Sequence, residues 1–368
     1  MKTNIIDLVA GARPNFMKLA PVVRALEARG DMPFRIIHTG QHYDAGMNGV
    51  FFEQLGIPAP DVHLEVGSGP HGAQTARILE RYEIHLTERR PAATVVFGDV
   101  NSTVACALAA VKLGVPVAHV EAGLRSFDRT MPEEINRLLT DAIADLLLVS
   151  EPSGVENLQR EGMADEKVRL VGNVMIDTLL AELEGARALG MPERLGLAPG
   201  GYGLVTLHRP SNVDDPGVLG RLLDLLIELG SRLPLVLPLH PRTAAAACQA
   251  GVSDKLHSAS GLRVVDPLPY RENLGLMASA KLVMTDSGGM QEETTVLGVP
   301  CLTLRENTER PITVTQGTSR LVGNDPGRIR VAFDDALVGR WPAGQAIPLW
   351  DGHAGDRVAA ALGEWIRA

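Results

Sequence analysis

The chain has 368 residues, of which 45% are hydrophobic, 21% are charged and only 4% are aromatic, and its formal net charge is −9. This length suits two α/β domains better than one. The acidic balance and the scarcity of aromatic side chains argue against nucleic-acid and anionic-membrane partners, although basic groups gathered in one cleft can still bind a small anion.

The three cysteines, Cys106, Cys248 and Cys301, are far apart and show no metal-ligand spacing. We interpret them as free thiols in a reducing cytosol. The first apolar run is short and is broken by Asp7, so no signal peptide is expected, and no stretch is long enough for a membrane span. The sequence therefore predicts a cytoplasmic protein.

Short runs rich in Val, Ile and Leu recur along the chain, separated by longer amphipathic segments. Runs that are apolar throughout are typical of strands buried on both faces of a parallel sheet. The expected strands are Ile5–Ala10, Phe34–His38, Thr94–Phe97, Val117–Val120, Leu146–Val149, Val168–Val171, Gly203–Leu207, Leu235–Leu239, Leu262–Val265, Leu282–Thr285 and Pro300–Leu304. The expected helices include Phe16–Arg29, Ala73–Arg90, Ser102–Leu113, Pro132–Ala144 and Pro216–Arg232. This alternation predicts α/β architecture with doubly wound sheets, of about six strands in the first half and about five in the second.

Glycine and proline residues between Leu189 and Gly203 indicate a loop, and a new β–α series begins at Gly203. We expect an N-terminal Rossmann-like domain over residues 1–172 and a C-terminal Rossmann-like domain over residues 173–352. The final segment, 353–368, has a helical pattern and is expected to pack on the first domain.

Ligands of parallel α/β sheets bind beyond the carboxyl ends of the strands, so residues that follow strands are the candidates for chemistry. Gly11 permits a tight turn after the first strand. Arg13 and Lys18 flank the next helix N-terminus, where phosphate binds well. Two solvated basic residues at a helix start are the alternative.

Three carboxylates, those of Asp99, Glu121 and Glu133, stand at strand ends or helix starts on the same expected rim. Helix capping explains Asp99 and Glu133 equally well. It does not explain Glu121, a charged residue at the end of an otherwise apolar strand. Carboxylates that converge raise one another's pKa values, which suits acid–base chemistry near neutral pH.

In the second half, His208 and His240 each follow an expected strand. For His240, a hydrogen bond to the backbone explains the position as well as a ligand does. Ser287-Gly288-Gly289 joins a strand to a helix, and its glycines let the backbone approach a pyrophosphate.

One helical turn beyond this glycine pair, Glu292 or Glu293 is within reach of a ribose diol. Arg310 lies on the loop after a later strand and could bind a diphosphate bidentately. A surface ion pair with Glu306 or Glu309 is the alternative for this arginine.

Other cofactor signals are missing. The first strand is not followed by Gly-x-Gly-x-x-Gly, so NAD is not expected, and there is no Walker A lysine loop. No spacing of Asp, Glu, His or Cys indicates a dedicated metal site. The sequence therefore predicts neither a metal nor a cofactor.

Together these segments resemble the non-hydrolysing UDP-N-acetylglucosamine 2-epimerase family. The most specific match is Thr285–Glu293 with the Thr-Glu-Arg-Pro that ends at Pro311. The other matching stretches are spread in order over almost the whole chain: Gly11–Lys18, His38–His42, Gly98–Thr103, His119–Ser126, Pro132–Arg137, Gly172–Asn173, Thr206–Arg209 and Pro238–Pro241.

The resemblance implies a GT-B-like fold with an active-site cleft between the domains, a homodimer, and reversible conversion of UDP-GlcNAc to UDP-ManNAc. It implies acid–base roles for Asp99, Glu121 and Glu133. The residues that it implies for UDP binding are Arg13, Lys18, His208, Ser287, Gly288, Gly289 and Arg310, with Glu293 on the ribose. His208 also counts among the catalytic residues, and Arg137 and His240 line the same site.

Some positions depart from the common family pattern. Gln41 and His42 belong to a stretch that contributes to a regulatory site in many bacterial members, but Tyr43-Asp44 follows them in place of Arg-Glu. This puts substrate activation in doubt. Asn273 stands where an aromatic residue near the uracil is usual, and Tyr270 is the candidate substitute.

The chemistry of C2 epimerisation favours elimination. The C2 proton is not next to a carbonyl, and a redox route would need NAD. In elimination, a carboxylate takes this proton while UDP leaves C1, and UDP then returns to the 2-acetamidoglucal as a proton arrives on the opposite face. The route needs cations for the diphosphate and carboxylates near C2.

Three rival functions share parts of this pattern: a GT-B glycosyltransferase, a catalytically silent nucleotide-sugar sensor, and a hydrolysing 2-epimerase that releases UDP. A modified substrate such as a 2,3-diacetamido uronic acid also remains open, as does the biosynthetic pathway, whether for a polysaccharide or a specialised product.

Overall fold

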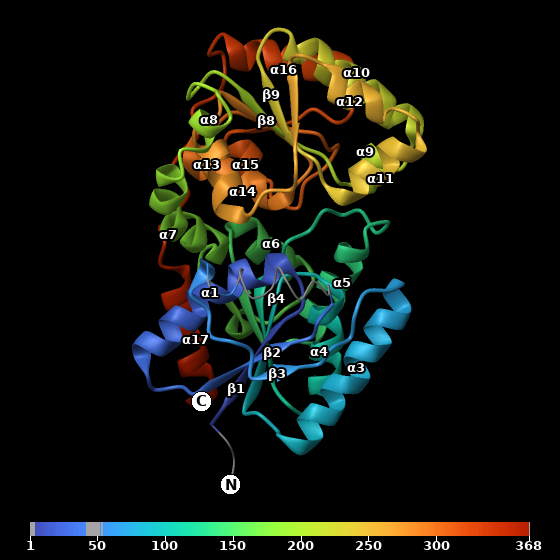
Figure 1. Cartoon of the computed structure of the whole chain (residues 1–368). Helices are drawn as coiled ribbons and strands as arrows, with labels where there is room; N and C mark the ends of the chain where they lie inside the picture. The colour runs from blue at the N-terminus through green and yellow to red at the C-terminus, as the bar shows by residue number, and fades with distance from the viewer. Residues whose placement is uncertain (1–3, 42–51, 53, 368) are drawn as a thin grey trace. The chain divides into compact units, whose positions relative to one another are not determined.

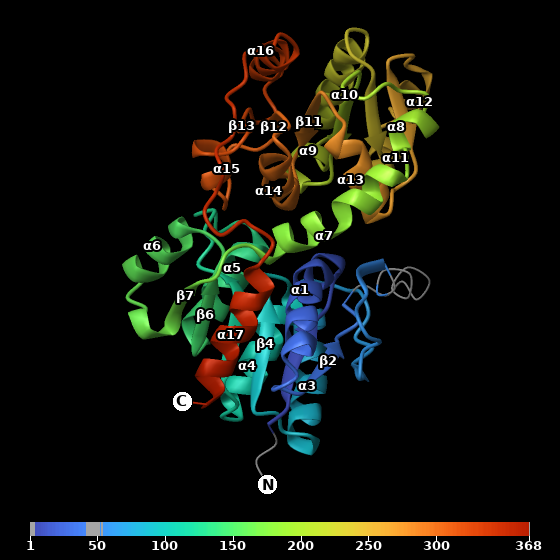
Figure 2. The same cartoon turned by 90° about the vertical axis from the view of Figure 1, so that its left-hand side faces the viewer.

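The structure is a computed structural model that describes residues 4–41, 52 and 54–367, without the side chains of Arg13, His257 and Ser258. His42, one of the two predicted regulatory residues, lies outside the described residues. The chain divides into two compact units, one formed by Met1–Thr178 with Pro348–Ala368 and the other by Leu179–Ile347. In each unit, helices cover both faces of a sheet (Figures 1 and 2).

The first unit contains a parallel sheet of seven described strands in the order β3-β2-β1-β4-β5-β6-β7. The central strands β1 and β4 are buried along their whole length, which explains their unbroken apolar sequence. The strands are β1 Ile6–Ala10, β2 Phe34–His38, β3 Val62–His63, β4 Ala93–Phe97, β5 Val117–Ala122, β6 Leu146–Val149 and β7 Val168–Leu170.

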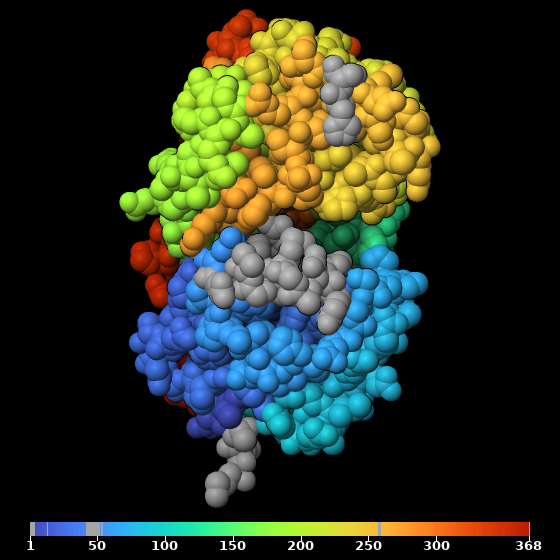
Figure 3. Space-filling model, in the orientation of Figure 1, coloured from blue at the N-terminus to red at the C-terminus, as the bar shows by residue number. Residues whose placement is uncertain are grey.

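The helices of this unit form two layers. Helices α1 and α17 lie side by side on one face, and α3, α4 and α5 pack in sequence on the other (Figures 1 and 2). The outer surface of α3 is open to solvent (Figure 3), and its Ile84 is 54% exposed. The helices are α1 Arg13–Arg29, α3 His71–Glu88, α4 Asn101–Lys112, α5 Pro132–Ile143, α6 Pro152–Arg160, the 3-10 turn Asp165–Lys167 and α17 Ala354–Arg367. Helix α7 Val174–Ala188 begins in this unit and continues in the second.

The second unit contains a parallel sheet of six strands in the order β10-β9-β8-β11-β12-β13. The strands are β8 Gly203–Thr206, β9 Leu235–Pro238, β10 Leu262–Val265, β11 Leu282–Thr285, β12 Cys301–Thr303 and β13 Ser319–Leu321. The helices are α8 Met191–Arg194, α9 Pro210–Val213, α10 Pro216–Gly230, α11 Pro241–Gln249, α12 Ser253–Ser258, α13 Tyr270–Ala278, α14 Gly288–Leu297, α15 Ile312–Thr315 and α16 Pro326–Leu337.

Local sequence fixes several helix starts in this unit. Asp215 and Asp325 precede α10 and α16, and each carboxylate accepts a backbone N–H of the first turn. Both helices have proline in the first turn, where its missing N–H costs nothing. A leucine-rich core packs α10 and α16 on one face of the sheet.

The predicted α/β class, two Rossmann-like doubly wound units of a GT-B-like fold, is confirmed. The predicted strand numbers are wrong, because β3 and β13 were missed. Both are short edge strands, and β13 reads Ser-Arg-Leu, so neither shows the apolar run that marks a strand buried on both faces.

The observed division lies at different residues from the predicted one: residues 173–178 and 348–352 belong to the first unit. Long-range hydrogen bonds explain this. The Thr178 hydroxyl donates to the Met17 carbonyl at 2.6 Å. The Trp350 indole donates to the Ser150 carbonyl at 3.1 Å. Asp177 accepts the N–H groups of Ala354 and Gly355, at the start of α17.

In the part of the chain that the structure describes, no helix combines the length and the apolar character needed to cross a bilayer.

Replacing Asp177 by alanine removes both acceptors at the N-terminus of α17. We expect the free energy of unfolding of the first unit to fall by about 1–2 kcal/mol, the usual effect of losing a helix cap. Calorimetric melting of Asp177→Ala measures this loss, with the exposed Asp356→Ala in the same helix turn as control. Equal melting temperatures of the two variants would contradict the capping role.

Candidate functional site

The turn between β1 and α1 is held by Asn15. Its side-chain oxygen accepts the N–H groups of Gly11 and Ala12, both at 3.1 Å, and its amide donates to the Phe97 carbonyl at 2.8 Å. A side chain at Gly11 would collide with Ser102, 2.0 Å from the position of a Cβ. The turn is therefore fixed to the carboxyl end of β4. The side chain of Arg13, in this turn, lies outside the described residues.

Lys18 and Glu121 form a buried ion pair at this edge of the sheet, with the ammonium donating to Glu121 Oε2. The two residues are 103 positions apart in sequence. Gly98 provides the space for this pair, because a Cβ there would lie 2.6 Å from Lys18 Nζ and 3.1 Å from Glu121 Oε2. Gly98 also has a φ of 62°, a conformation that favours glycine.

Glu121 itself has a left-handed backbone, with a φ of 74°. It lies where β5 shifts register against β6, between Val120 and Ala122. A β-bulge of this kind redirects a side chain, and a non-glycine residue in this region costs about 1–3 kcal/mol. The bulge thus explains how a strand of buried apolar residues ends in a carboxylate at its rim.

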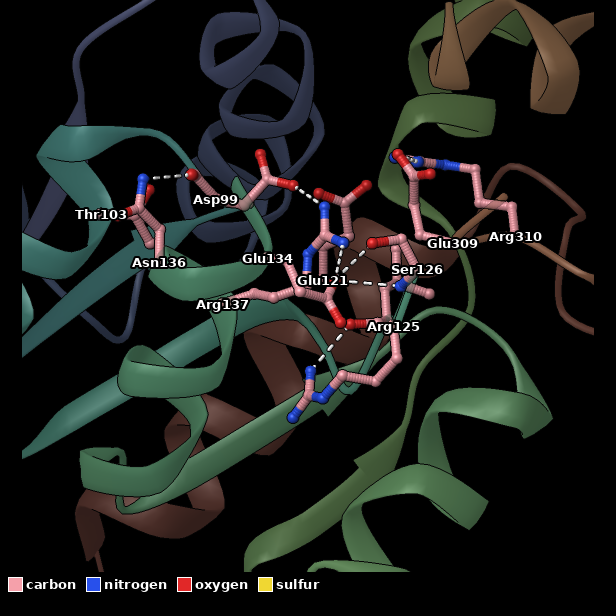
Figure 4. Close-up of polar contacts among 12 residues, drawn as sticks. Asp99, Thr103, Glu121, Arg125, Ser126, Glu134, Asn136, Arg137, Glu309 and Arg310 are labelled. Atoms are coloured by element: carbon pink, nitrogen blue, oxygen red, sulfur yellow. Dashed lines mark hydrogen bonds and ion pairs between the residues drawn. The ribbon is translucent and has the colours of Figure 1, made fainter. Parts of the chain in front are cut away.

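Asp99 is held by Arg137, whose guanidinium donates to Asp99 Oδ2 and, at 2.6 Å, to Glu134 Oε2 (Figure 4). Glu134 in turn accepts the backbone N–H groups of Ser126 and Phe127 at 2.9 and 3.0 Å. Arg137 is therefore locked between two carboxylates, and it brings the start of α5 to the turn after β4.

The structure removes helix capping as the interpretation of Asp99, and its acid–base role stays a prediction. Helix α4 begins at Asn101 without a side-chain cap, so Asp99 forms an ion pair instead of capping the helix. Glu133 lies half-buried in the first turn of α5, and its neighbour Glu134 makes the hydrogen bonds there. The acid–base role of Glu133 stays a prediction.

Gln41, the other predicted regulatory residue, is buried. Its side-chain oxygen accepts the Ser102 backbone N–H at 3.0 Å and the Ser102 hydroxyl at 2.7 Å. This contact ties the loop after β2 to the start of α4. The regulatory role of Gln41 stays a prediction.

In the second unit, His208 pairs with Asp286. Its Nδ1 lies 2.8 Å from Asp286 Oδ1, and Asp286 also accepts the backbone N–H of Arg209 at 2.9 Å. Burial alone would raise the pKa of Asp286, but the bond from His208 and the backbone N–H groups lower it below the ordinary value. An ionised Asp286 makes Nδ1 of His208 the donor in this pair.

The His240 ring centroid lies 5.4 Å from that of His208. Its Nδ1 accepts the Arg242 backbone N–H at 3.2 Å at the start of α11. Burial, followed by the neighbouring His208, lowers the pKa of His240. The bond to the backbone that the sequence offered as one interpretation is thus present, and a contact with a ligand remains a prediction.

Ser287, Gly288 and Gly289 form the turn from β11 into α14. A side chain at Gly288 would lie 2.5 Å from Arg310 Nη1, so glycine lets this guanidinium pack on the turn. Arg310 pairs with Glu292 and Glu309, at 2.7 and 2.8 Å. These ion pairs are buried, which corrects the surface pairing that the sequence suggested as the alternative.

Glu293 is buried one turn into α14, and its carboxylate accepts the Tyr270 hydroxyl at 2.9 Å. Burial raises the pKa of Glu293 to about 7, the Tyr270 hydrogen bond lowers it, and the nearby Glu292 raises it. Asn273 lies one turn along α13 from Tyr270. Tyr270 therefore contacts Glu293, the residue predicted to bind the ribose. The stacking of Tyr270 on uracil stays a prediction.

A raised pKa for Glu293 has a defined sign for stability. The folded state holds this proton more tightly than the unfolded state, so the stabilisation is complete below the ordinary value of 4.5 and is lost as the pH rises through about 7. Glu293→Gln stays neutral and should remove up to about 3 kcal/mol of this pH dependence between about pH 5 and about pH 8.

Thermal or urea unfolding across this pH range tests the role of Glu293. Glu272→Gln, a partly exposed carboxylate in α13, serves as control. If the unfolding free energy of Glu293→Gln changes with pH as steeply as that of the wild type, Glu293 is not the titrating group.

Several polar residues near these sites were not singled out from the sequence, namely Asn15, His119, Glu134, Asp141 and Asp286. Asp286 carried a usable signal, because a charged residue directly after a buried strand is the pattern that marked Glu121. Glu134 and Arg137 are three residues apart on one helix, a spacing that predicts contact. In the described residues, no group of three or more His, Cys, Asp or Glu side chains is placed to hold a metal ion.

The structure thus brings together Lys18 with Glu121, Asp99 with Arg137, His208 with His240, and Gly288 with Arg310. Two Rossmann-like units whose parallel sheets end in such charged residues place the chain in the GT-B-like class of α/β proteins.

Comparisons with known proteins give the family. The sequence profile of the UDP-N-acetylglucosamine 2-epimerase family matches residues 24–363. The chain is 41% identical over 367 residues to the UDP-N-acetylglucosamine 2-epimerase of Methanococcus maripaludis, covering 96% of each chain. The chain belongs to the UDP-N-acetylglucosamine 2-epimerase family, as the sequence motifs indicated.

Two further relatives carry the name of a UDP-sugar. The UDP-2,3-diacetamido-2,3-dideoxy-D-glucuronate 2-epimerase of Pseudomonas aeruginosa is 44% identical over 319 residues, covering 86% of this chain and 87% of that one. A crystal structure of the Methanocaldococcus jannaschii UDP-GlcNAc 2-epimerase in complex with UDP-GlcNAc and UDP has a TM-score of 0.90 at 40% identity, covering 98% of this chain and 99% of that one.

Proposed function

We propose that this chain is a non-hydrolysing epimerase that interconverts UDP-GlcNAc and UDP-ManNAc by eliminating UDP and adding it back. The observation that carries the proposal is the pair of carboxylates at one sheet edge, Asp99 and Glu121, each held by its own cation. Family membership and the UDP-GlcNAc complex of the Methanocaldococcus relative support the choice of substrate.

The first unit would supply the acid–base chemistry. Lys18 and Arg137 pair with Glu121 and Asp99, which would be the carboxylates that abstract the C2 proton. That proton passes to one carboxylate while the C1–O bond breaks and UDP departs with the bonding electrons. The reverse step adds UDP to C1 of the 2-acetamidoglucal as a carboxylic acid protonates C2 from the opposite face. Glu133 is proposed as the third carboxylate of this set.

The second unit would hold the nucleotide. The turn Ser287-Gly288-Gly289 opens α14, whose N-terminal amides and dipole favour a phosphate. Arg310 packs on this turn and could exchange a carboxylate for the diphosphate, while Glu293 accepts the ribose hydroxyls. His208 and His240 are proposed to line the site, with Nε2 of His208 facing the ligand.

A modified sugar is the second candidate substrate, because a relative with 44% identity is named for UDP-2,3-diacetamido-2,3-dideoxy-D-glucuronate. Proton NMR of the products from both UDP-sugars distinguishes the two. Exchange of the C2 hydrogen in D2O without an acceptor separates an epimerase from a glycosyltransferase, and release of free N-acetylmannosamine would indicate a hydrolysing enzyme. A homodimer and a cytoplasmic location stay predictions.

Asp99→Asn and Glu121→Gln keep the shape of each side chain but remove its basicity. We expect each to lower the rate of C2 exchange at least about 100-fold, because a positioned acid or base contributes that much or more. UDP binding by titration calorimetry should be retained. The exposed Glu166→Gln is the matched control, and wild-type turnover in both site variants would refute their assignment.

Arg310→Ala should mainly weaken UDP-sugar binding, by about 10- to 100-fold, the loss expected for a charge-assisted hydrogen bond. Arg310→Lys keeps the charge needed by Glu292 and Glu309 but loses the planar fork, so it separates folding from ligand binding. Calorimetric titration with UDP measures both, with the surface variant Arg330→Ala as control. An unchanged dissociation constant in Arg310→Ala argues against a diphosphate contact.

A further inference from the structure

His119 is a buried histidine in β5 that none of the proposed chemical steps uses. Its side chain is 0% exposed. Nδ1 lies 2.7 Å from Asp141 Oδ1 on α5, and Nε2 lies 2.8 Å from the Gly98 carbonyl oxygen. Both ring nitrogens therefore face oxygen atoms at hydrogen-bonding distance.

Both oxygen atoms act only as acceptors. A carbonyl oxygen has no proton to give. Burial would raise the pKa of Asp141, but the neighbouring His119 and Arg125 lower it below the ordinary value. The other oxygen of Asp141 already accepts the Gly123 N–H at 3.0 Å and lies 2.7 Å from Arg125. A neutral imidazole carries a single N–H, so it would leave one nitrogen lone pair facing an acceptor.

The charged groups around His119 and its partner are Asp141, Arg125 and Glu161, which binds Arg125 at 2.6 and 2.8 Å. Asp141 and Arg125 are buried, whereas the Glu161 side chain is 32% exposed. Arg125 therefore pairs with the second oxygen of Asp141 and leaves Oδ1 to His119.

We propose that His119 is a positioning residue that donates from both ring nitrogens and so holds the two backbone turns carrying Asp99 and Glu121. One N–H binds the Gly98 carbonyl, next to Asp99. The other binds Asp141, whose second oxygen holds the amide of Gly123, two residues after Glu121. One imidazolium thus links the positions of both carboxylates.

This inference rests on the proposed function for its catalytic consequence, but the charge of His119 can be measured without substrate. Nitrogen-15 labelling of the histidine rings, with His119→Gln to assign the signals, shows whether both ring nitrogens carry protons. We expect one N–H signal from each ring nitrogen of His119 in the folded enzyme. A ring with a single N–H overturns the inference.

Activity provides the second test. His119→Gln cannot donate in both directions, so we expect kcat for C2 exchange to fall about 100-fold, as for a small misplacement of reacting groups. KM and the dissociation constant for UDP should stay within about threefold, since UDP is proposed to bind the second unit. Wild-type kcat in His119→Gln would overturn the positioning role.

His353→Gln is the matched control, because His353 also faces an aspartate, Asp356 at 3.2 Å, but on the exposed start of α17. It should keep wild-type kcat. If the wild-type enzyme itself shows no C2 exchange, the proposed function fails, whereas the ring protonation of His119 is still decided by the NMR experiment.

Discussion

The ion pair between Lys18 and Glu121 is the interaction on which the rest of the first unit depends. An isolated buried carboxylate is too costly to keep ionised, so the fold must bring a cation to it. Lys18 comes from the first helix and Glu121 from the fifth strand, and the pair fits only because Gly98 has no side chain. Asp99 forms an ion pair in the same way with Arg137 from α5. Pairing therefore joins four separate segments of the chain at one rim.

The ion pairs also set the electrostatic surroundings of Asp99 and Glu121. The sequence suggested that three converging carboxylates act on one another. In the structure the nearest charged neighbours of Asp99 and Glu121 are instead a guanidinium and an ammonium. In the elimination proposed above, a departing anion would draw on the same positive charges.

In the second unit, a buried arginine is likewise paired with groups of opposite charge. Arg310 lies against Glu292 and Glu309, and Arg305 lies 2.7 Å from Glu309. A diphosphate that bound Arg310 would compete with carboxylates already in place. Such competition selects ligands with more charge than a carboxylate, because a singly charged anion gains little by the exchange.

Much of this could be predicted from the sequence, and the exceptions have physical reasons. Strands buried on both faces produce apolar runs, so β1 and β4 were easily recognised, whereas the edge strand β13 was not. Glu121 was singled out because a charge at the end of an apolar strand needs an explanation. Its partner could not be predicted, since Lys18 lies 103 residues away and no local pattern links them. The same holds for the contacts of Asp177 that move the domain boundary.

The backbone strain at Glu121 explains why buried hydrogen bonds are needed beneath the site. Glu121 adopts a left-handed backbone at a bulge, a conformation that persists only when its surroundings impose it. The bonds that impose it lie beneath the rim: Gly98 donates to the Val120 carbonyl at 3.0 Å and accepts from His119. Asp141 fixes the amide of Gly123 on the other side. A strained carboxylate held from both sides cannot relax toward a more ordinary geometry, and a fixed position is what the proposed proton transfer asks of this group.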